Sequence, residues 1–372
     1  MKEYKIISIV AVFVLLYFLS ASPIMMDDGF HYEGFAESLA KGKLDFKTYY
    51  GFHGLSIISV PIFWITKSEY SIIITSAILY LLSLSLAYAI GNRFYQNKAA
   101  GFYFMALVLL MPYVYSTMMR GFQEAALLFF ILLTIYGAIN KNRWTSLAWA
   151  YGGIVKPFNL VLFPLFVKDF LPTRVPFLAR VVWIIAALAI GVVYLGASYY
   201  QTGHLINNAA IGSYQGNFNT GSPPPLVESF APGAKGFLRV GANMLLHFRK
   251  ILISPLAIIL GGLVLLRNKK LKLRNEIVLA ILLNVLLVGS LTFSFSKYLL
   301  PAAVLLALCS VSYLLKYRWL FAWVLVDSLF VFLPIWDYFG KPFWGNIYLY
   351  FTPFWLAIII YVFANRYSHT NS

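Results

Sequence analysis

Apolar segments of roughly the length that crosses a membrane recur along the whole chain, and this recurrence constrains the fold more than any other feature. Hydrophobic residues make up 61% of the chain and charged residues only 11%, whereas a soluble domain has about a quarter of its residues charged. The solvent of this chain is therefore expected to be lipid. The sequence predicts an all-α polytopic membrane protein, in which a single transmembrane domain over residues 1–372 contains about twelve transmembrane helices.

The predicted spans cover residues 5–24, 70–91, 99–116, 122–140, 144–155, 158–168, 180–200, 250–266, 277–295, 298–315, 319–335 and 346–364. The fifth and sixth are too short to cross a bilayer alone. Gly152, Gly153 and Pro157 lie between or within them, and we expect a broken or re-entrant pair at this point. Such a break is tolerated where the backbone is buried in protein or lines a wet cavity.

The charge pattern predicts a direction for the bundle. The formal net charge is +16, and in membrane proteins Lys and Arg gather at the cytoplasmic ends of spans. If the N-terminus is cytoplasmic, nearly every inner connection is basic, and only Glu3, Asp169 and Glu276 of the thirteen acids fall inside. We therefore expect a multi-pass protein of the plasma (cytoplasmic) membrane with both termini in the cytoplasm.

Other classes of protein fit the same composition less well. A basic run interleaved with aromatic residues, which would favour nucleic-acid binding, is missing from the sequence. The single cysteine, Cys309, excludes a disulfide or a cysteine metal site within one chain. The first apolar segment could be a signal peptide, but Pro23 directly after its small residues disfavours cleavage, so we interpret it as a retained span.

Two long segments are expected on the outer side, residues 25–69 and 201–250. In the first, a helix is predicted from Gly29 to Lys41, because apolar and charged side chains separate onto two faces. The apolar face holds Tyr32, Phe35, Ala36, Leu39 and Ala40, and the other face holds Glu33, Glu37 and Lys41. A second short helix is predicted from Gly54 to Thr66, and both would lie in the membrane interface. The segment 201–250 is rich in Gly, Asn and Pro, which is typical of a lid or binding loop.

Two acidic positions on the outer side are candidates for chemistry. Asp27 and Asp28 stand where the first span ends and the interfacial helix begins. One carboxylate there could act as a general base or help to hold a divalent cation, or Asp28 could simply cap the helix, with Asp27 solvated beside it. Glu124, at the start of the fourth span, could line the same cavity together with Arg120, or it could only stabilise a helix N-terminus.

Several cations and one histidine complete the set of candidates. Lys156 and Lys297 lie between apolar stretches, where a lysine is either functional, paired or reaching the interface. Arg249 closes the second outer segment beside Lys250 and could meet a phosphate. His53 is a candidate for the acceptor site, and the histidines show no metal-ligand spacing. Asp327, in the middle of a span, is expected to have a buried partner.

Four sequence elements together resemble the GT-C superfamily of membrane glycosyltransferases, in particular the group that includes the protein O-mannosyltransferases and the lipid A aminoarabinose transferase. That group shows an acidic pair after the first span, a second acid near the fourth, a G-x-x-x-[TV]-K element and an R-Y-L-L-P element. The positions that resemble these elements are Asp27, Asp28, Tyr32, Ala36, Leu39 and Gly42, then Glu124, then Gly152 to Lys156, then Ser296 to Pro301. Lys297 stands where the group has Arg, and a C-terminal soluble domain is not expected.

The resemblance implies inverting transfer of a sugar from a polyprenyl-phosphate carrier to a lipid, glycan or protein acceptor at the outer face of the membrane. It implies that Asp27 is the base, with Asp28 as its neighbour or replacement, and that Glu124 is the second acid. Arg120, Lys156, Lys297 with Tyr298, and Arg249 would meet the carrier phosphate, whose negative charge grows as the glycosyl bond breaks. Beyond membrane lipids, no other partner is implied, and the requirement for a divalent cation stays open.

Two alternatives from other classes remain. A transporter or lipid flippase would place its ionisable residues near the bilayer midplane on discontinuous helices, and here only Asp327 and the broken pair around Lys156 fit that pattern. A non-catalytic membrane scaffold would have no use for two organised outer acids.

Overall fold

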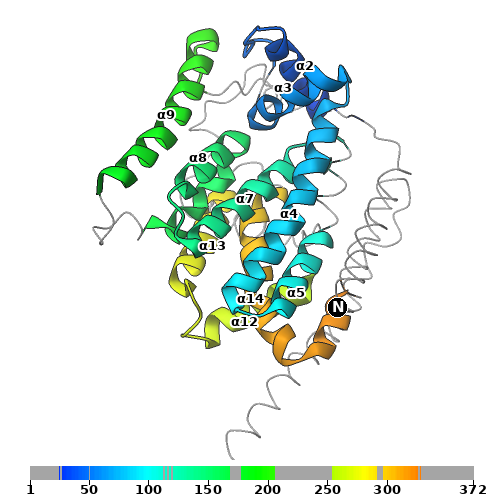
Figure 1. Cartoon of the computed structure of the whole chain (residues 1–372), viewed down its shortest axis with the longest axis vertical. Helices are drawn as coiled ribbons and strands as arrows, with labels where there is room; N and C mark the ends of the chain where they lie inside the picture. Colours follow the sequence, from blue (N-terminus) through cyan, green and yellow to red (C-terminus); the bar gives the residue numbers. More distant parts are fainter. Residues whose placement is uncertain are drawn as a thin grey trace, which may run out of the picture.

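The computed structural model describes residues 25, 27–49, 51–111, 114, 117–118, 120–167, 177–205, 254–290, 296–325 and 327. All regular structure in these residues is helical (Figure 1). Most of the described helices run side by side in a bundle, and two short helices lie across one end of it (Figure 1). The predicted spans at 5–24 and 346–364 and nearly all of the segment 201–250 lie outside the described residues.

The two short helices across the end are α2 (Asp27–Ala40) and α3 (Gly54–Thr66). We call them, with residues 41–49 and 51–53 between them, the cap. The apolar stripe predicted for α2 is confirmed, because Tyr32, Phe35 and Ala36 are buried, and Glu37 pairs with Lys41 at 2.5 Å as the i,i+4 spacing predicts. The bounds predicted for the second short helix are those of α3.

Three helices form the centre of the bundle: α4 (Ser71–Tyr95), α5 (Lys98–Leu109) and α7 (Glu124–Asn140). A tight turn joins α4 to α5, with Gln96 in a left-handed conformation at φ 52° and Asn97 capping α5 through Ala99 N–H. The fully buried Tyr80 of α4 donates its hydroxyl to the carbonyl of Leu109, the last residue of α5. The shortened α5 is therefore tied to α4 at its far end.

The predicted broken pair is confirmed as α8 (Thr145–Val155) followed by η1 (Pro157–Leu165). The second piece is a 3-10 helix, not an α-helix: Pro157 opens it at a position where no N–H is needed, and Pro164 inside it removes a donor from α-helical hydrogen bonding. Gly152 makes the fold-back possible, since a Cβ there would overlap the side chain of Asn159. The break places Lys156 at the turn between the two pieces, close to the cap.

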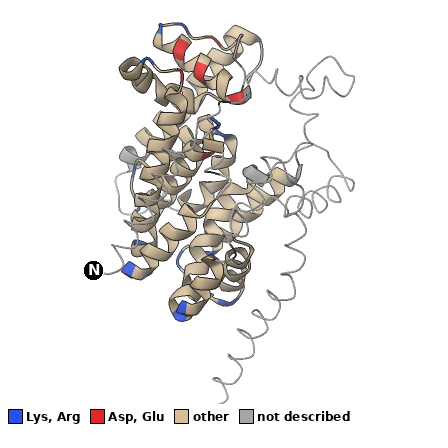
Figure 2. Ribbon diagram, turned by 90° about the vertical axis from the view of Figure 1, so that its right-hand side faces the viewer, with Lys and Arg blue, Asp and Glu red and all other residues tan. Residues whose placement is uncertain are grey.

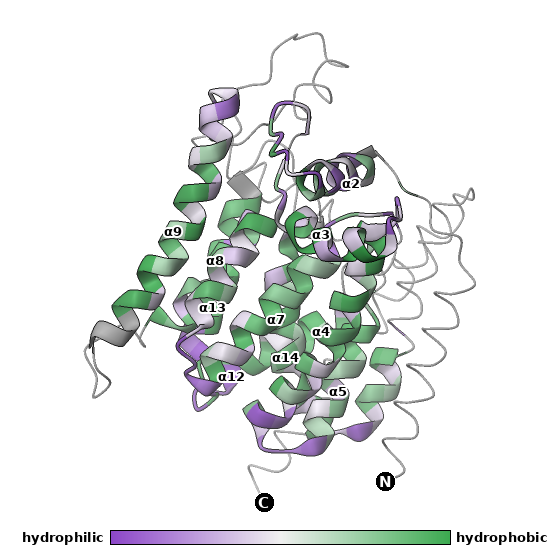
Figure 3. Ribbon diagram, turned by 45° about the horizontal axis from the view of Figure 1, so that its top comes forward, coloured by the Kyte–Doolittle hydropathy of each residue, from purple (hydrophilic) through white to green (hydrophobic). Residues whose placement is uncertain are grey.

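α9 (Phe177–Thr202) lies at the side of the bundle, where it packs against α8 (Figures 1 and 3). Much of its apolar side is exposed among the described residues, including Val192 and Val193 at 68% and 70% exposure. Its polar residues are concentrated near the cap, where Gln201 accepts a hydrogen bond from Phe46 N–H and donates one to the Leu44 carbonyl. Tyr194 also accepts a hydrogen bond from His53 N–H there. α9 therefore exposes an apolar surface and holds the cap by polar contacts.

The remaining described helices are α12 (Pro255–Arg267), α13 (Arg274–Ser290), η4 (Ser296–Leu299), α14 (Leu300–Lys316) and residues 318–325. α12 crosses α14 at Gly261, where an added Cβ would overlap the carbonyl of Leu306. Asp327 has the buried partner that the sequence led us to expect: its carboxylate accepts hydrogen bonds from the Ser254 hydroxyl and from Leu256 N–H, at the start of α12.

Two of the described helices are long and apolar enough to cross a membrane, α4 and the part of α9 from Val181 to Thr202. The expected number of about twelve spans is not confirmed. Shorter apolar helices are α3, α5, α7, α12 and α14. Hydrophobic residues predominate along these helices, and hydrophilic ones gather in the cap and in the turns at the opposite end (Figure 3). The described Asp and Glu gather mainly at the cap (Figure 2).

Candidate functional site

The start of α2 lies against the turn that leads into α7. A Cβ built on Gly29 would lie only 2.5 Å from the carbonyl oxygen of Arg120, and one built on Gly121 would lie 3.1 Å from the Cα of Gly29. Gly121 has a positive φ of 78°, which favours glycine. Two glycines thus let these backbones touch, and the acidic pair at Asp27 and Asp28 is brought next to the turn that precedes Glu124.

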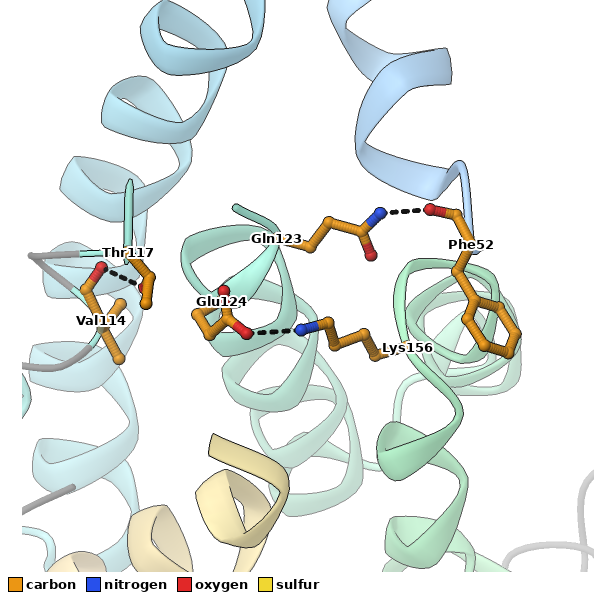
Figure 4. A network of polar contacts seen from close by, with 6 residues as sticks. All are labelled: Phe52, Val114, Thr117, Gln123, Glu124 and Lys156. Atoms are coloured by element: carbon orange, nitrogen blue, oxygen red, sulfur yellow. Dashed lines mark hydrogen bonds and ion pairs between the residues drawn. The ribbon is translucent and has the colours of Figure 1, made fainter. Parts of the chain in front are cut away.

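Glu124 and Lys156 form an ion pair between the first turn of α7 and the end of α8 (Figure 4). The Glu124 side chain is fully buried, and that of Lys156 is only 12% exposed. Residue 156 can face α7 because it leaves the helical path, in an extended conformation between α8 and Pro157. The structure therefore joins two residues that the sequence analysis had considered separately, and it gives Lys156 a paired position in place of one reaching the interface.

Gln123 is a site residue that the sequence analysis missed. Its side-chain NH2 donates to the carbonyl of Phe52, just before α3, and it points to the same region as the Glu124–Lys156 pair (Figure 4). Its amide oxygen is buried and accepts no hydrogen bond from the described residues. The signal in the sequence was its position beside Glu124, but nothing there shows that its partner comes from the cap.

Tyr298 reaches the same corner from η4. Its ring stacks on Phe158 with centroids 4.3 Å apart, and the Lys156 ammonium lies 6.0 Å from the ring centroid. The buried amide of Asn284 donates to the Tyr298 carbonyl at 3.0 Å and accepts from Ala302 N–H, so α13 fixes where α14 begins. Lys297, the preceding residue, lies in η4, and its side chain is not among those described.

The acidic pair lies in the first turn of α2, where the positive end of the helix dipole favours carboxylates. The Asp28 side chain is partly exposed, and for Asp27 only the backbone is described. Because α2 already begins at Asp27, Asp28 is a first-turn residue of the helix and not the residue before it. Arg120 is partly buried in the adjoining turn.

Glu33 departs from the prediction that it lies on a solvent-facing side of α2. It is 6% exposed, and its carboxylate accepts hydrogen bonds from the Ser71 hydroxyl at 2.5 Å and from Ile72 N–H at 2.8 Å. It therefore supplies an acceptor for a backbone N–H at the N-terminus of α4, which has no partner within that helix. The sequence around α2 does not show that Glu33 has this role. Burial raises the pKa of Glu33, and these two hydrogen bonds lower it.

His53 is completely buried in the cap. Its ring stacks on Phe35 at 3.8 Å with an interplanar angle of 3°, beside Phe46. Burial lowers the pKa of His53 to about 3, so the ring is neutral at physiological pH. In this conformation the ring is enclosed by protein, which does not suit the acceptor-binding role suggested for it. Arg249 lies outside the described residues.

The residues brought together are one buried ion pair, one acidic helix start, one buried amide and a stacked aromatic pair, supplied by α2, α7, α8, η1 and η4. The described residues contain no group of three or more His, Cys, Asp or Glu suited to hold a metal ion. A carboxylate beside cations at the end of an apolar bundle can deprotonate a hydroxyl and neutralise an anionic leaving group.

Comparison of the chain with models of protein families, with characterised proteins and with solved structures gives no match.

Proposed function

We propose that this chain is a multi-pass membrane glycosyltransferase of the GT-C type. It transfers a sugar from a polyprenyl-phosphate donor to an acceptor at the outer face of the membrane. The cap lies on that outer face, both termini are cytoplasmic, and about twelve helices cross the bilayer. The apolar surface of α4 and α9 supports a membrane location, since the charged residues of the described chain lie mainly at the two ends of the bundle.

One observation carries the proposal. The four sequence elements that resemble the GT-C group are separated by up to about 270 residues, yet their described parts meet at one corner. Arg120 touches the start of α2, Glu124 pairs with Lys156, and Lys156 lies over Tyr298. Bundle packing alone does not require that the start of α2, the Glu124–Lys156 pair and Tyr298 share a corner.

In the proposed reaction Asp27, or Asp28 in its place, removes the proton of an acceptor hydroxyl. The hydroxyl oxygen then bonds to the anomeric carbon of the sugar from the side opposite the phosphate. The bond between that carbon and the phosphate oxygen breaks, its electron pair stays on the oxygen, and polyprenyl phosphate leaves. Attack from the opposite side inverts the anomeric configuration.

In the proposed reaction Lys156 and Arg120 meet the growing charge of the phosphate. The ion pair with Glu124 holds the Lys156 ammonium at this corner, where its positive charge can act on the phosphate. Glu124 is therefore better assigned the positioning of Lys156 than direct proton transfer. The buried amide oxygen of Gln123 could accept a hydrogen bond from a hydroxyl of the bound sugar.

Donor turnover by the full-length protein in lipid vesicles tests the proposal. A panel of radiolabelled polyprenyl-phosphate hexoses, N-acetylhexosamines and pentoses is supplied with a membrane extract as the acceptor source. We expect release of polyprenyl phosphate and labelled product from one donor class, and at least a hundredfold loss in Asp27→Asn, since general base catalysis contributes about 10²–10⁴-fold.

Glu37→Gln is the matched control, because Glu37 is an exposed carboxylate of the same helix and pairs only with Lys41 among the described residues. It should retain wild-type turnover. Near wild-type activity in both Asp27→Asn and Asp28→Asn would rule out the proposed base, and no turnover of any donor class by the wild type would rule out the enzyme.

The alternative of a transporter rests on Asp327, the acid predicted within a span, and on the broken pair around Lys156. The hydrogen bonds of Asp327 to Ser254 and Leu256 give it a structural role at the start of α12, which accounts for it without transport. A transporter would show gradient-driven flux in vesicles and no glycosylated product.

A further inference from the structure

Three cations from three separate turns meet at the end of the bundle opposite the cap. Arg93 lies in the last turn of α4, Lys141 caps the C-terminus of α7, and Lys272 lies in the turn between α12 and α13. Arg93 Nε donates to the side-chain oxygen of Asn140 at 3.1 Å, and Lys272 Nζ donates to the Ile139 carbonyl at 3.3 Å. Both cations therefore attach to the two residues that directly precede Lys141.

Among the described residues no acid forms an ion pair with Arg93, Lys141 or Lys272, and Glu276, the acid of α13 that follows Lys272, is buried. The two ion pairs found there join Lys41 to Glu37 and Lys156 to Glu124, both at the cap end. Partial burial, together with the positive charges of Arg93 and Lys141, lowers the pKa of Lys272. Like charges gathered at the end of one helix repel, so the arrangement is more stable when an anion lies between them.

Two ordinary roles explain only part of this geometry. Cations favour helix C-termini, which accounts for Arg93 and Lys141 on their own helices, and basic turns favour the cytoplasmic side of a membrane. Neither role requires the Lys272 side chain to extend from the turn between α12 and α13 and donate a hydrogen bond to the end of α7. Its contact with Ile139 brings the third charge to the other two.

We propose that Arg93, Lys141 and Lys272 form a binding site for the phosphate of an anionic phospholipid in the inner leaflet. All three side chains remain exposed, so their free N–H groups can reach a headgroup. Phosphate matches both partner types, with the guanidinium binding two oxygens and each ammonium acting as a point charge. The inference rests on the proposed membrane location and orientation, and it is independent of the proposed reaction.

The experiment titrates full-length protein in a non-ionic detergent with dioleoyl phosphatidylglycerol or dioleoyl phosphatidylcholine, and counts bound lipid by native mass spectrometry. These lipids share their chains and differ in headgroup charge. We expect tighter binding of phosphatidylglycerol by the wild type. The triple variant Arg93→Gln, Lys141→Gln, Lys272→Gln should bind it about a hundredfold more weakly, because each basic residue near a lipid phosphate contributes roughly a fivefold factor.

The charge-matched control is Lys269→Gln, Lys270→Gln, Lys316→Gln, which removes three lysines from the same end of the bundle but outside the cluster. It should keep most of the affinity. The single variant Lys272→Gln, expected to lose about fivefold, serves if the triple variant does not fold. Equal losses in the triple variant and its control would overturn the site, since any three charges would then be equivalent.

A second arm separates a lipid headgroup from free phosphate. Thermal unfolding is followed in the same detergent with inorganic phosphate or with phosphatidylglycerol, at matched ionic strength. Stabilisation by phosphatidylglycerol alone supports the lipid assignment. Equal stabilisation by inorganic phosphate, lost in the triple variant, would overturn the lipid assignment and identify a soluble phosphate compound as the ligand.

Discussion

At the residue scale, a charge that is buried in an apolar bundle loses its hydration, which costs free energy. Glu124 and Lys156 face this cost together, because they form an ion pair. Their side chains are 0% and 12% exposed, so neither charge is well solvated by water. A paired arrangement offsets much of the desolvation, whereas removal of one partner leaves the other charge buried without its ammonium or carboxylate. The pair should therefore respond to mutation as a unit.

Lys156→Met is expected to lower the thermal stability strongly, because breaking a buried pair from one side costs about 3–5 kcal/mol. The double variant Glu124→Gln, Lys156→Met should be more stable than this single variant, since both charges are gone. Thermal unfolding in detergent measures the order. A double variant less stable than Lys156→Met would show that the two residues do not act as a pair, and both variants should be inactive in donor turnover.

Glu33, which binds the start of α4, is expected to make the stability of the folded protein depend on pH. Its pKa is raised in the folded protein from the ordinary value of 4.5, mainly by burial. An acid with a raised folded pKa favours the folded state below its unfolded pKa, and that contribution is lost as the pH rises through the folded value.

Glu33→Gln keeps one acceptor oxygen for Ile72 N–H, places an NH2 donor beside the Ser71 hydroxyl oxygen, and removes the titration. The unfolding temperature of this variant should therefore rise relative to wild type as the pH increases from about 4.5 to 7, the range above the ordinary glutamate pKa. Melting curves of both proteins across this range provide the measurement. A relative fall of the variant with rising pH would contradict the assigned direction.

At the scale of the element, α12 offers two adjacent glycines in different surroundings. A Cβ on Gly261 would lie 2.8 Å from the carbonyl carbon of Leu306 in α14, whereas one on Gly262 meets nothing within 4 Å. Gly261→Ala should force α12 and α14 apart and cost about 1–3 kcal/mol, the usual range for overpacking. Gly262→Ala should be neutral or stabilising by up to about 1 kcal/mol through helix propensity.

Equilibrium unfolding of the two variants under one set of conditions checks this contrast. Equal stabilities would mean that α12 and α14 do not pack at Gly261 as described.

The elements that depend on local pattern could be predicted from the sequence, and those that depend on a distant partner could not. The stripe on α2, the bounds of α3 and the break before Pro157 follow from periodicity and from glycine and proline chemistry. The 3-10 geometry of η1 and the end of α5 at Leu109, where the prediction extended to residue 116, were missed.

The same division applies to the candidate site. Glu124 and Lys156 were recognised as residues needing a partner, but their pairing is a property of how α7 meets α8. The burial of Glu33 and the hydrogen bond of Gln123 to Phe52 likewise depend on how the cap packs on the bundle. The spacing of residues along the chain does not predict this packing. Polar residues that join elements are thus the least visible part of the fold in the sequence.

At the scale of the whole molecule, the charged cap and the basic turns lie at opposite ends of the bundle (Figure 2). The proposed orientation therefore predicts opposite accessibility for the two ends. The chain suits thiol labelling, because its single cysteine, Cys309, is buried. Lys43 in the cap and Lys270 in the turn after α12 are both exposed and serve as label positions.

In intact cells, Lys43→Cys should react with a membrane-impermeant maleimide and Lys270→Cys should react only after the cells are opened. Mass tagging on a gel measures both. Reaction of Lys270→Cys in intact cells, with Lys43→Cys protected, would invert the proposed orientation, and reaction of both would exclude a membrane between the two ends.

The bond from Glu33 to the start of α4 also bears on the order in which the protein can assemble during synthesis. The Ser71 and Glu33 partners are 38 residues apart, and the Trp64 indole reaches the Ala40 carbonyl across 24. By contrast, the clamp of Gln201 on Phe46 spans 155 residues and the bond of Tyr95 to Leu308 spans 213. Since a chain leaves the ribosome N-terminus first, the cap can seat on α4 while most of the bundle has not yet been made. The later helices would then pack against a cap that is already folded on α4. The hydrogen bond from the cap to α9 would form only after residue 201 has been synthesised.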